Sequence, residues 1–212
     1  MKMKNETEIS MLDTAEKFYN MGYNYIAGID EVGRGPLAGP VCAAAVILPR
    51  GFAIDEINDS KKISEKKREK LYDVIIDAAV AYSVAFVEPE VIDEINIRRA
   101  THRAMQAAVD GLPQAADFLL VDGNDKIPFD NVECEYVIKG DATYECIAAA
   151  SILAKVTRDR YMCEADGIYP GYDFAKNKGY GTKSHMEGIR SLGLTPIHRK
   201  TFITPKVLGI EK

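Results

Sequence analysis

The chain has 212 residues, of which 47% are hydrophobic and 28% are charged, a balance typical of a soluble globular protein and not of a disordered one. No apolar stretch approaches the ~20 residues that a membrane-spanning helix needs, and the first residues, MKMKNETEISMLD, lack the apolar core of a signal peptide. The formal net charge is −5, which argues only weakly against a nucleic-acid partner, because a phosphate backbone responds to local potential.

Cysteines and basic residues give two further indications. The cysteines lack CxxC spacing, so we expect free thiols in a reducing cytoplasm and no zinc site. Basic residues gather in short groups, and each group alone is most simply explained as a solvated helix face or loop. The groups are Lys61, Lys62, Lys66, Lys67 and Arg68; Arg98, Arg99 and Arg103; Lys176, Lys178 and Lys183; His198, Arg199 and Lys200.

The pattern of apolar residues and turn signals predicts strands and helices in a definite order. A helix in 64–78 has Ser64 as its expected N-cap. The order predicts an α/β fold with a mixed sheet, in which an antiparallel meander is extended by parallel strands and covered by helices on both faces. The other predicted elements are a short helix in 11–23, strands at 25–30, 41–48, 82–87, 117–123 and 133–141, and helices at 95–112, 142–163 and 183–192.

Carboxylates stand at the predicted ends of three strands. They are Asp30 with Glu31, Asp122 and Asp141. If these strands are neighbours, the acids converge at one end of the sheet, where like charges repel unless a cation neutralises them. Oxygen ligands of this kind suit magnesium or manganese, and two such ions would form a phosphoryl-transfer site.

Simpler explanations exist for each acid. Asp30 and Glu31 fit a solvated strand end, Asp122 fits a turn, and Asp141 fits the N-cap of the following helix. The repeated position of the acids on successive strands favours a shared site.

The segment Gly33-Arg34-Gly35 follows the first of these acids directly. Glycine lets backbone N–H groups approach a ligand, and Arg34 is suited to a phosphate. A dinucleotide-binding loop is disfavoured, because the glycine spacing is wrong and Pro36 removes an amide. The other explanation is a tight turn between two strands.

Taken in order, these residues closely resemble the bacterial ribonuclease HII family. The resemblance runs from about Tyr25 to Phe202. It rests on GIDEVGRGPLAGPV at 28–41, DSKK at 59–62, VDGN at 121–124, KGD at 139–141, AASILAKVTRD at 149–159, NKGYGT at 177–182 and HRKTF at 198–202.

The resemblance implies a ribonuclease H-like fold, a five-stranded mixed sheet flanked by helices with a small helical C-terminal extension. Its parts would be a short leader helix (1–23), the catalytic core (24–165) and the extension (166–212), which contributes to substrate binding. It implies an endonuclease, dependent on Mg²⁺ or Mn²⁺, that cuts the RNA strand of RNA/DNA hybrids. It also implies nicking of duplex DNA 5′ to a single embedded ribonucleotide, leaving 3′-hydroxyl and 5′-phosphate ends, in the removal of ribonucleotides from DNA.

Site residues follow by motif from the same resemblance. The catalytic, metal-binding acids would be Asp30, Glu31, Asp122 and Asp141. The backbone of Gly33, Arg34 and Gly35 would read the 2′-hydroxyl, which both donates and accepts hydrogen bonds. Tyr180 would contact this hydroxyl and stack on the next deoxyribose.

The remaining motif residues admit more than one role. Ser60 and Lys61 would contact phosphate, or Lys61 would be a solvated loop lysine. Sequence leaves open whether Lys155 and Arg158, which share a helix face, contact phosphate or water. The roles of Asp159, His198 and Arg199 are equally open.

The expected location and binding partners follow from the sequence and the family resemblance. We expect a cytoplasmic monomer that binds nucleic acid and no membrane. The tail ITPKVLGIEK has no glutamine-plus-aromatic motif for a sliding clamp. The alternatives are another nuclease such as a resolvase-like enzyme, a non-catalytic hybrid-binding module, or a nucleotide-binding domain.

Overall fold

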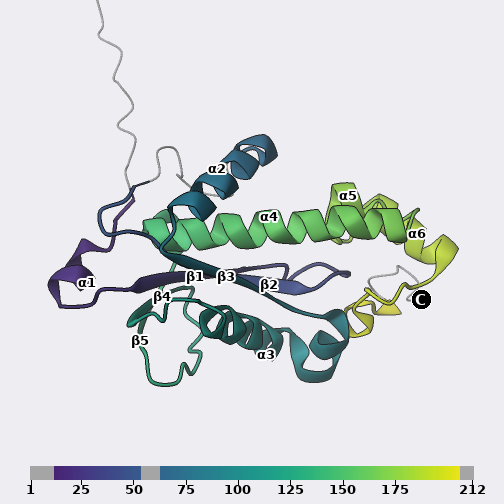
Figure 1. The fold of residues 1–212 in the computed structure, drawn as a ribbon. Helices are drawn as coiled ribbons and strands as arrows, with labels where there is room; N and C mark the ends of the chain where they lie inside the picture. Colours follow the sequence, from purple (N-terminus) through teal and green to yellow (C-terminus); the bar gives the residue numbers. More distant parts are fainter. Residues whose placement is uncertain (1–11, 54–62, 206–212) are drawn as a thin grey trace, which may run out of the picture.

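A single five-stranded sheet forms the centre of the computed structural model, which describes residues 12–53 and 63–205 (Figure 1). The strand order is β3-β2-β1-β4-β5. Neighbours β3, β2 and β1 pair antiparallel, and β4 and β5 extend the sheet in parallel beside β1. The strands are β1 (Ile26–Val32), β2 (Val41–Ile47), β3 (Ala81–Val87), β4 (Phe118–Asp122) and β5 (Glu133–Val137).

Helices cover both faces of the sheet, as Figure 1 shows. Helix α4 (Glu145–Ile168) lies along one face with α2 (Glu65–Ala78) packed against it, and α3 (Pro89–Asp110) covers the other face. The predicted mixed sheet with flanking helices is confirmed. The remaining elements are α1 (Glu16–Asn20), α5 (Phe174–Asn177), α6 (Lys183–Leu192) and the 3₁₀ turns Gly140–Ala142 and Lys200–Phe202.

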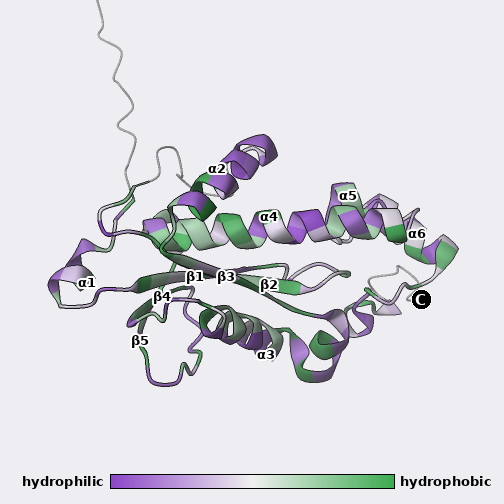
Figure 2. Ribbon diagram, in the orientation of Figure 1, coloured by the Kyte–Doolittle hydropathy of each residue, from purple (hydrophilic) through white to green (hydrophobic). Residues whose placement is uncertain are grey.

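Alternation along β1 divides the interior into two layers. Ala27 and Ile29 point to the α3 face and Ile26 points to the α4 face, because successive side chains of a strand point to opposite sides. In Figure 2 the N-terminal half of α4 is largely green and its middle is purple. The change marks the point where α4 leaves the apolar core and reaches polar surroundings.

Gly28 on β1 allows α4 to pack directly on the strand. A Cβ at this position would lie 2.1 Å from the carbonyl carbon of Cys146, a distance that no side chain can adopt. The α4 backbone therefore touches β1 just before the end of the strand that carries Asp30 and Glu31.

A third apolar cluster joins the C-terminal segment to the end of α4. Met162 on α4 packs with Phe174, Met186 and Ile189, and Leu37 from the β1–β2 connection completes the cluster. The β1–β2 connection is thus held between α4 and the C-terminal segment. Among the described residues, no helix has the length and apolarity needed to cross a membrane.

Several boundaries differ from the sequence prediction. Helix α1 is limited to Glu16–Asn20, α3 begins at Pro89 and is interrupted by a non-helical Asn96, and α4 continues to Ile168. Strand β5 ends at Val137, not at Asp141, because Lys139 adopts a left-handed conformation with φ 58° and starts a 3₁₀ turn. Asp141 therefore lies in a turn after the strand, and α4 begins only at Glu145. The predicted N-cap is confirmed, since the Ser64 side chain accepts a hydrogen bond from Lys67 N.

Candidate active site

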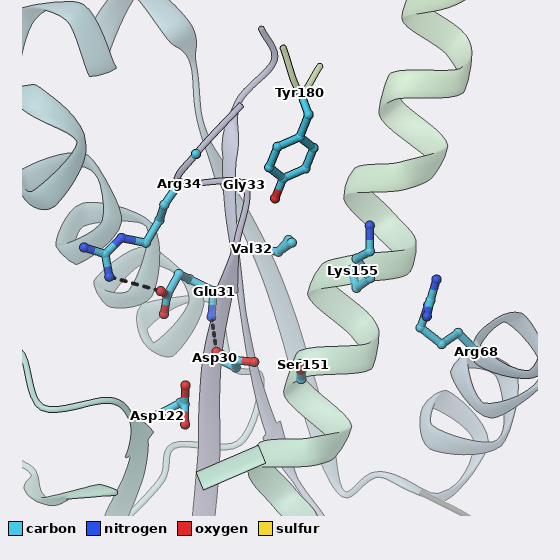
Figure 3. A pocket seen from close by; sticks show the side chains of 11 residues that line it. Asp30, Glu31, Val32, Gly33, Arg34, Arg68, Asp122, Ser151, Lys155 and Tyr180 are labelled. Atoms are coloured by element: carbon cyan, nitrogen blue, oxygen red, sulfur yellow. Dashed lines mark hydrogen bonds and ion pairs between the residues drawn. The ribbon is translucent and has the colours of Figure 1, made fainter. Parts of the chain in front are cut away.

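A pocket of about 580 Å³ lies at the end of β1 that carries the acids (Figure 3). It brings together three of the four predicted acids, the glycine loop and the predicted tyrosine, although these residues are up to 150 positions apart in the chain. Its lining residues are Asp30, Glu31, Val32, Gly33, Arg34, Gly35, Arg68, Asp122, Ser151, Lys155 and Tyr180.

Strand register places Asp30 next to Asp122. Parallel pairing matches Ile29 with Val121, so the next residue of each strand is one of the two acids. Both acids also point to the α4 side of the sheet, because side chains alternate along a strand. Leu120, two residues before Asp122, belongs to the core on the α4 side. Two carboxylates thus stand side by side on neighbouring strands, while Glu31 points toward the opposite face.

Burial and mutual repulsion disfavour ionisation of these acids. Burial, followed by the charges of Glu31 and Asp122, raises the pKa of Asp30 well above its usual value. Hydrogen bonds from the Ser151 side chain and from Glu31 N, the latter at 2.7 Å, act in the opposite direction. Burial also raises the pKa of Glu31, although the adjacent Arg34 partly offsets this effect.

The donor set suits a hard divalent cation, because carboxylate oxygens that repel one another are stabilised by a shared cation. As the side chains stand, the acids have protein partners instead. Glu31 Oε1 is 3.3 Å from Arg34 Nη1, and Asp122 Oδ1 accepts a hydrogen bond of 2.6 Å from Gly140 N (Figure 3). Within 12–53 and 63–205, no group of three or more His, Cys, Asp and Glu side chains forms a ready-made metal cluster. The residues fit a metal in chemistry, and Glu31 and Asp122 each keep a second partner, in Arg34 and in Gly140.

The fourth predicted acid, Asp141, lies close to the pocket but does not line it. Its side chain is buried, and it follows Gly140, whose N–H binds Asp122. Asp141 therefore belongs to the same corner of the sheet. The predicted contacts Ser60 and Lys61 lie outside the described residues.

The glycine loop closes the pocket opposite the acids. Gly33 has φ +90°, and a Cβ there would meet Arg158 Nε at 2.2 Å, so a side chain is excluded on both grounds. A Cβ at Gly35 would lie 3.6 Å from Tyr180 Cε1, which places the tyrosine ring against the loop. Tyr180 is 45% exposed, and its ring is open to a ligand.

A stripe of α4 forms another wall. Ser151 and Lys155 are four residues apart and therefore lie on the same helix face. Lys155 Nζ is 2.6 Å from Asp159 Oδ1, and Arg68 from α2 also reaches the pocket. Sequence reasoning did not assign Ser151 or Arg68 to the site, although the i, i+4 spacing of Ser151 and Lys155 was a usable signal.

Comparison with known proteins identifies the family of this chain. The family model described as ribonuclease HII matches residues 27–205. The chain belongs to the ribonuclease HII family. It is therefore a hydrolase, an endonuclease of the ribonuclease H class that acts on nucleic acid.

Individual relatives agree with the family assignment. The ribonuclease HII of Leuconostoc mesenteroides is 52% identical over 202 residues, which cover 95% of this chain and 79% of that protein. The crystal structure of ribonuclease H2 from Pyrococcus horikoshii has a TM-score of 0.73 at 28% identity, covering 87% of this chain and 97% of that one. A structure of Bst-RNase HIII in complex with Mn²⁺ has a TM-score of 0.62 at 21% identity, covering 99% and 77%. The predicted ribonuclease H-like fold is confirmed.

Two arginines of this ribonuclease HII family member are buried behind the pocket. Arg158 and Arg199 are each 0% exposed, so neither is a solvated residue and neither faces a phosphate. Arg158 donates to the carbonyls of Pro40, Ala38 and Lys178 at 2.9 to 3.1 Å. Both of the alternatives considered for Arg158 from the sequence are thus wrong.

A buried histidine pair lies behind Tyr180 in this family member. His198 Nδ1 accepts from Thr195 N at 2.8 Å, so its proton is on Nε2, which donates to His185 Nε2 at 3.1 Å. His185 must then donate from Nδ1 to Tyr180 O at 3.0 Å. The chain of bonds requires both rings to be neutral, and it fixes the backbone of Tyr180.

We expect Asp30→Asn to stabilise the metal-free protein by about 1 to 3 kcal/mol, because it removes a buried charge that its neighbours repel. Urea unfolding in EDTA at pH 8 measures the gain. The gain should shrink as the pH falls, since wild-type Asp30 becomes protonated below its raised pKa. Equal or lower stability of the variant at pH 8 would contradict the proposed repulsion.

We expect the histidine pair to make the protein sensitive to acid. Burial, followed by the repulsion that a protonated His185 would exert, lowers the pKa of His198 from 6.5 to about 4. Between these values the unfolded chain binds more protons, so stability falls as the pH drops from 6.5 to 4, by on the order of 3 kcal/mol. Chemical unfolding at several pH values should show a shallower fall for His198→Gln than for wild type. Wild type and His198→Gln have the same carboxylates, so a difference between their slopes of stability against pH reports the histidine. Equal slopes would refute this account.

Proposed function

We propose that this chain is a divalent-metal-dependent endonuclease that recognises the junction between ribonucleotide and deoxyribonucleotide. It cuts the RNA strand of RNA/DNA hybrids and nicks duplex DNA 5′ to a single embedded ribonucleotide. The products carry 3′-hydroxyl and 5′-phosphate ends, and the role is the removal of ribonucleotides from DNA. The observation that carries the proposal is the single pocket in which acids, glycine loop and tyrosine meet.

Asp30, Glu31 and Asp122 would hold Mg²⁺ or Mn²⁺, with Asp141 completing the set from the adjacent turn. Support comes from their shared pocket, their oxygen-only chemistry and the repulsion that raises the pKa of Asp30. Bound ions of this kind supply a more acidic water and neutralise charge on a phosphate. A ribonuclease HIII of the same fold has been solved in complex with Mn²⁺.

The protein's own groups orient the substrate in this proposal. Lys155 and Arg68 supply positive charge on the pocket wall nearest α4 and α2, where a phosphate backbone would pass. The backbone of Gly33, Arg34 and Gly35 reads the 2′-hydroxyl. Tyr180 packs on the sugar that follows and leaves no room for a second hydroxyl, which selects a deoxyribose by exclusion.

We also propose a division of labour along the chain. Residues 1–23 form a leader, 24–165 the catalytic core, and 166–212 an extension that contributes Tyr180 to substrate binding. Support comes from the third apolar cluster, in which Phe174, Met186 and Ile189 of the extension pack against residues of the core such as Met162, although α4 itself continues to Ile168.

We expect a DNA duplex with one embedded ribonucleotide to be nicked in Mg²⁺ or Mn²⁺ and to stay intact in EDTA. Asp30→Asn and Asp122→Asn should lower the cleavage rate at least about 100-fold, because each removes a ligand charge at the reacting phosphate. Their affinity for the duplex should stay within a few-fold of wild type. Gel assays of cleavage and fluorescence anisotropy in EDTA provide the two measurements.

Asp110→Asn is the matched control, because Asp110 is an exposed acid on α3. It should cleave at the wild-type rate. Full activity of Asp30→Asn would exclude the acids as the metal site, and cleavage of long hybrids alone would exclude junction recognition.

We expect Tyr180→Ala to lose at least about tenfold in cleavage of the single-ribonucleotide duplex, because the sugar loses its stacking partner. Binding of Mg²⁺, followed by calorimetry, should not change, because the ring is separate from the acids. Tyr82→Ala on β3, also an exposed tyrosine, is the control and should behave as wild type. A matching loss of metal binding in Tyr180→Ala would refute the assignment.

A further inference from the structure

Arg199 directs its whole guanidinium group at one loop. Nη2 donates to Gly33 O at 2.6 Å, Nη1 to Arg34 O at 3.0 Å, and Nε to Gly39 O at 2.9 Å. The side chain is 0% exposed, and no Asp or Glu of the described residues pairs with it. A fully buried cation is costly, and here its hydrogen bonds go to three backbone carbonyls, while the nearby charge of Asp93 also favours the charged form.

Planarity of the peptide bond gives these contacts a second effect. In a trans peptide, the C=O of one residue and the N–H of the next point in opposite directions. When Arg199 draws the carbonyls of Gly33 and Arg34 to its own side, it turns the N–H groups of Arg34 and Gly35 to the other side.

The N–H groups so oriented are available to a ligand. Arg34 and Gly35 both line the pocket that contains the acids. Across 12–53 and 63–205, no acceptor is within hydrogen-bond distance of the backbone N–H of either residue. Two adjacent amide donors thus stand at the pocket, next to the ring of Tyr180.

The backbone of Arg199 is itself anchored to the same loop. Its N–H donates to Leu37 O at 2.8 Å, and Gly39 N donates to Ile197 O at 2.8 Å, on either side of a bridge between Ala38 and His198. Phe202 lies under the guanidinium, with its ring centre 5.2 Å from Arg199 Cζ. Burial and the nearby charge of Arg158 lower the pKa of Arg199 to about 9, which leaves it charged at neutral pH.

We propose that Arg199 is a positioning residue for sugar recognition, which fixes the peptide planes of the glycine loop so that the Arg34 and Gly35 amides face the ribose 2′-oxygen. Arg199 does not touch substrate. The inference rests on the proposed function, because it concerns how the loop distinguishes ribose from deoxyribose. A lysine cannot replace it, since a single ammonium group lacks the planar fork that holds several carbonyls at once.

The test compares the affinity of wild type, Arg199→Lys and Arg158→Lys for two duplexes in EDTA, by fluorescence anisotropy. One duplex contains a single ribonucleotide and the other is all-deoxy. Wild type should prefer the ribonucleotide duplex. In Arg199→Lys the preference should fall about tenfold, as expected for two misdirected hydrogen bonds, with all-deoxy affinity unchanged.

Arg158→Lys is the matched control. Arg158 is equally buried and packs against Gly33, but the three carbonyls that it binds belong to Ala38, Pro40 and Lys178, so it does not orient the peptide planes of Gly33 and Arg34. Thermal unfolding of both variants reports the loss of stability that they share. A fall in preference in Arg199→Lys that exceeds the fall in Arg158→Lys supports the proposal. An equal fall in both, or an undiminished preference in Arg199→Lys, overturns it.

A second measurement uses the wild-type protein alone and remains decisive if Arg199→Lys does not fold. In ¹⁵N spectra of the free protein, the Arg199 Nε–H should be protected from exchange with water. The Arg34 and Gly35 amide signals should shift with the ribonucleotide duplex and not with the all-deoxy duplex. A rapidly exchanging Nε–H overturns the role of Arg199. If wild type binds both duplexes equally, the proposed sugar recognition itself fails.

Discussion

The parallel pairing of β1 with β4 brings two carboxylates together at the end of the sheet. Because Ile29 is matched with Val121, Asp30 and Asp122 come side by side on the face that α4 covers. Nearby groups donate hydrogen bonds to both carboxylates: Ser151 and the Glu31 amide bind Asp30, and the Gly140 amide binds Asp122. The fold places like charges in a buried corner at a cost in stability, an arrangement typical of functional sites and not of optimised cores.

Two buried arginines bind the glycine loop beside the acids. Arg158 and Arg199 approach it from α4 and from the C-terminal segment, and their hydrogen bonds go to carbonyl oxygens. Carbonyls held in this way cannot rotate freely, so the loop keeps one shape before a substrate arrives. Gly33 contributes by allowing both the positive φ and the contact with Arg158. Rigid backbone donors suit the recognition of a single hydroxyl, which offers few atoms to distinguish it.

Much of this could be predicted from the sequence, because the informative signals were local or came in ordered motifs. Strand patterns predicted the mixed sheet, and the family resemblance predicted which acids, glycines and tyrosine belong together. The end of β5 was wrong because a left-handed Lys139 has no clear sequence signature, and this put Asp141 in a turn. The burial of Arg158 and Arg199 could not be predicted, because an arginine that shares a helix face with a lysine, or that stands in a basic group, normally indicates a solvated or phosphate-binding side chain. Only the packing of three distant segments shows that their partners are carbonyls.

The contact between Arg199 and the glycine loop also has a consequence for the order of folding. The hydrogen bond from Arg199 to Arg34 O joins residues separated by 165 positions, and the bridge between Ala38 and His198 closes a similar span. During synthesis, the sheet strands and α4 leave the ribosome long before residues 197–199. A nascent chain can therefore bring its acids together before Arg199 binds the carbonyls of the glycine loop. Under the proposed function, discrimination between sugars would therefore be acquired later than the cluster of acids, when the last segment docks.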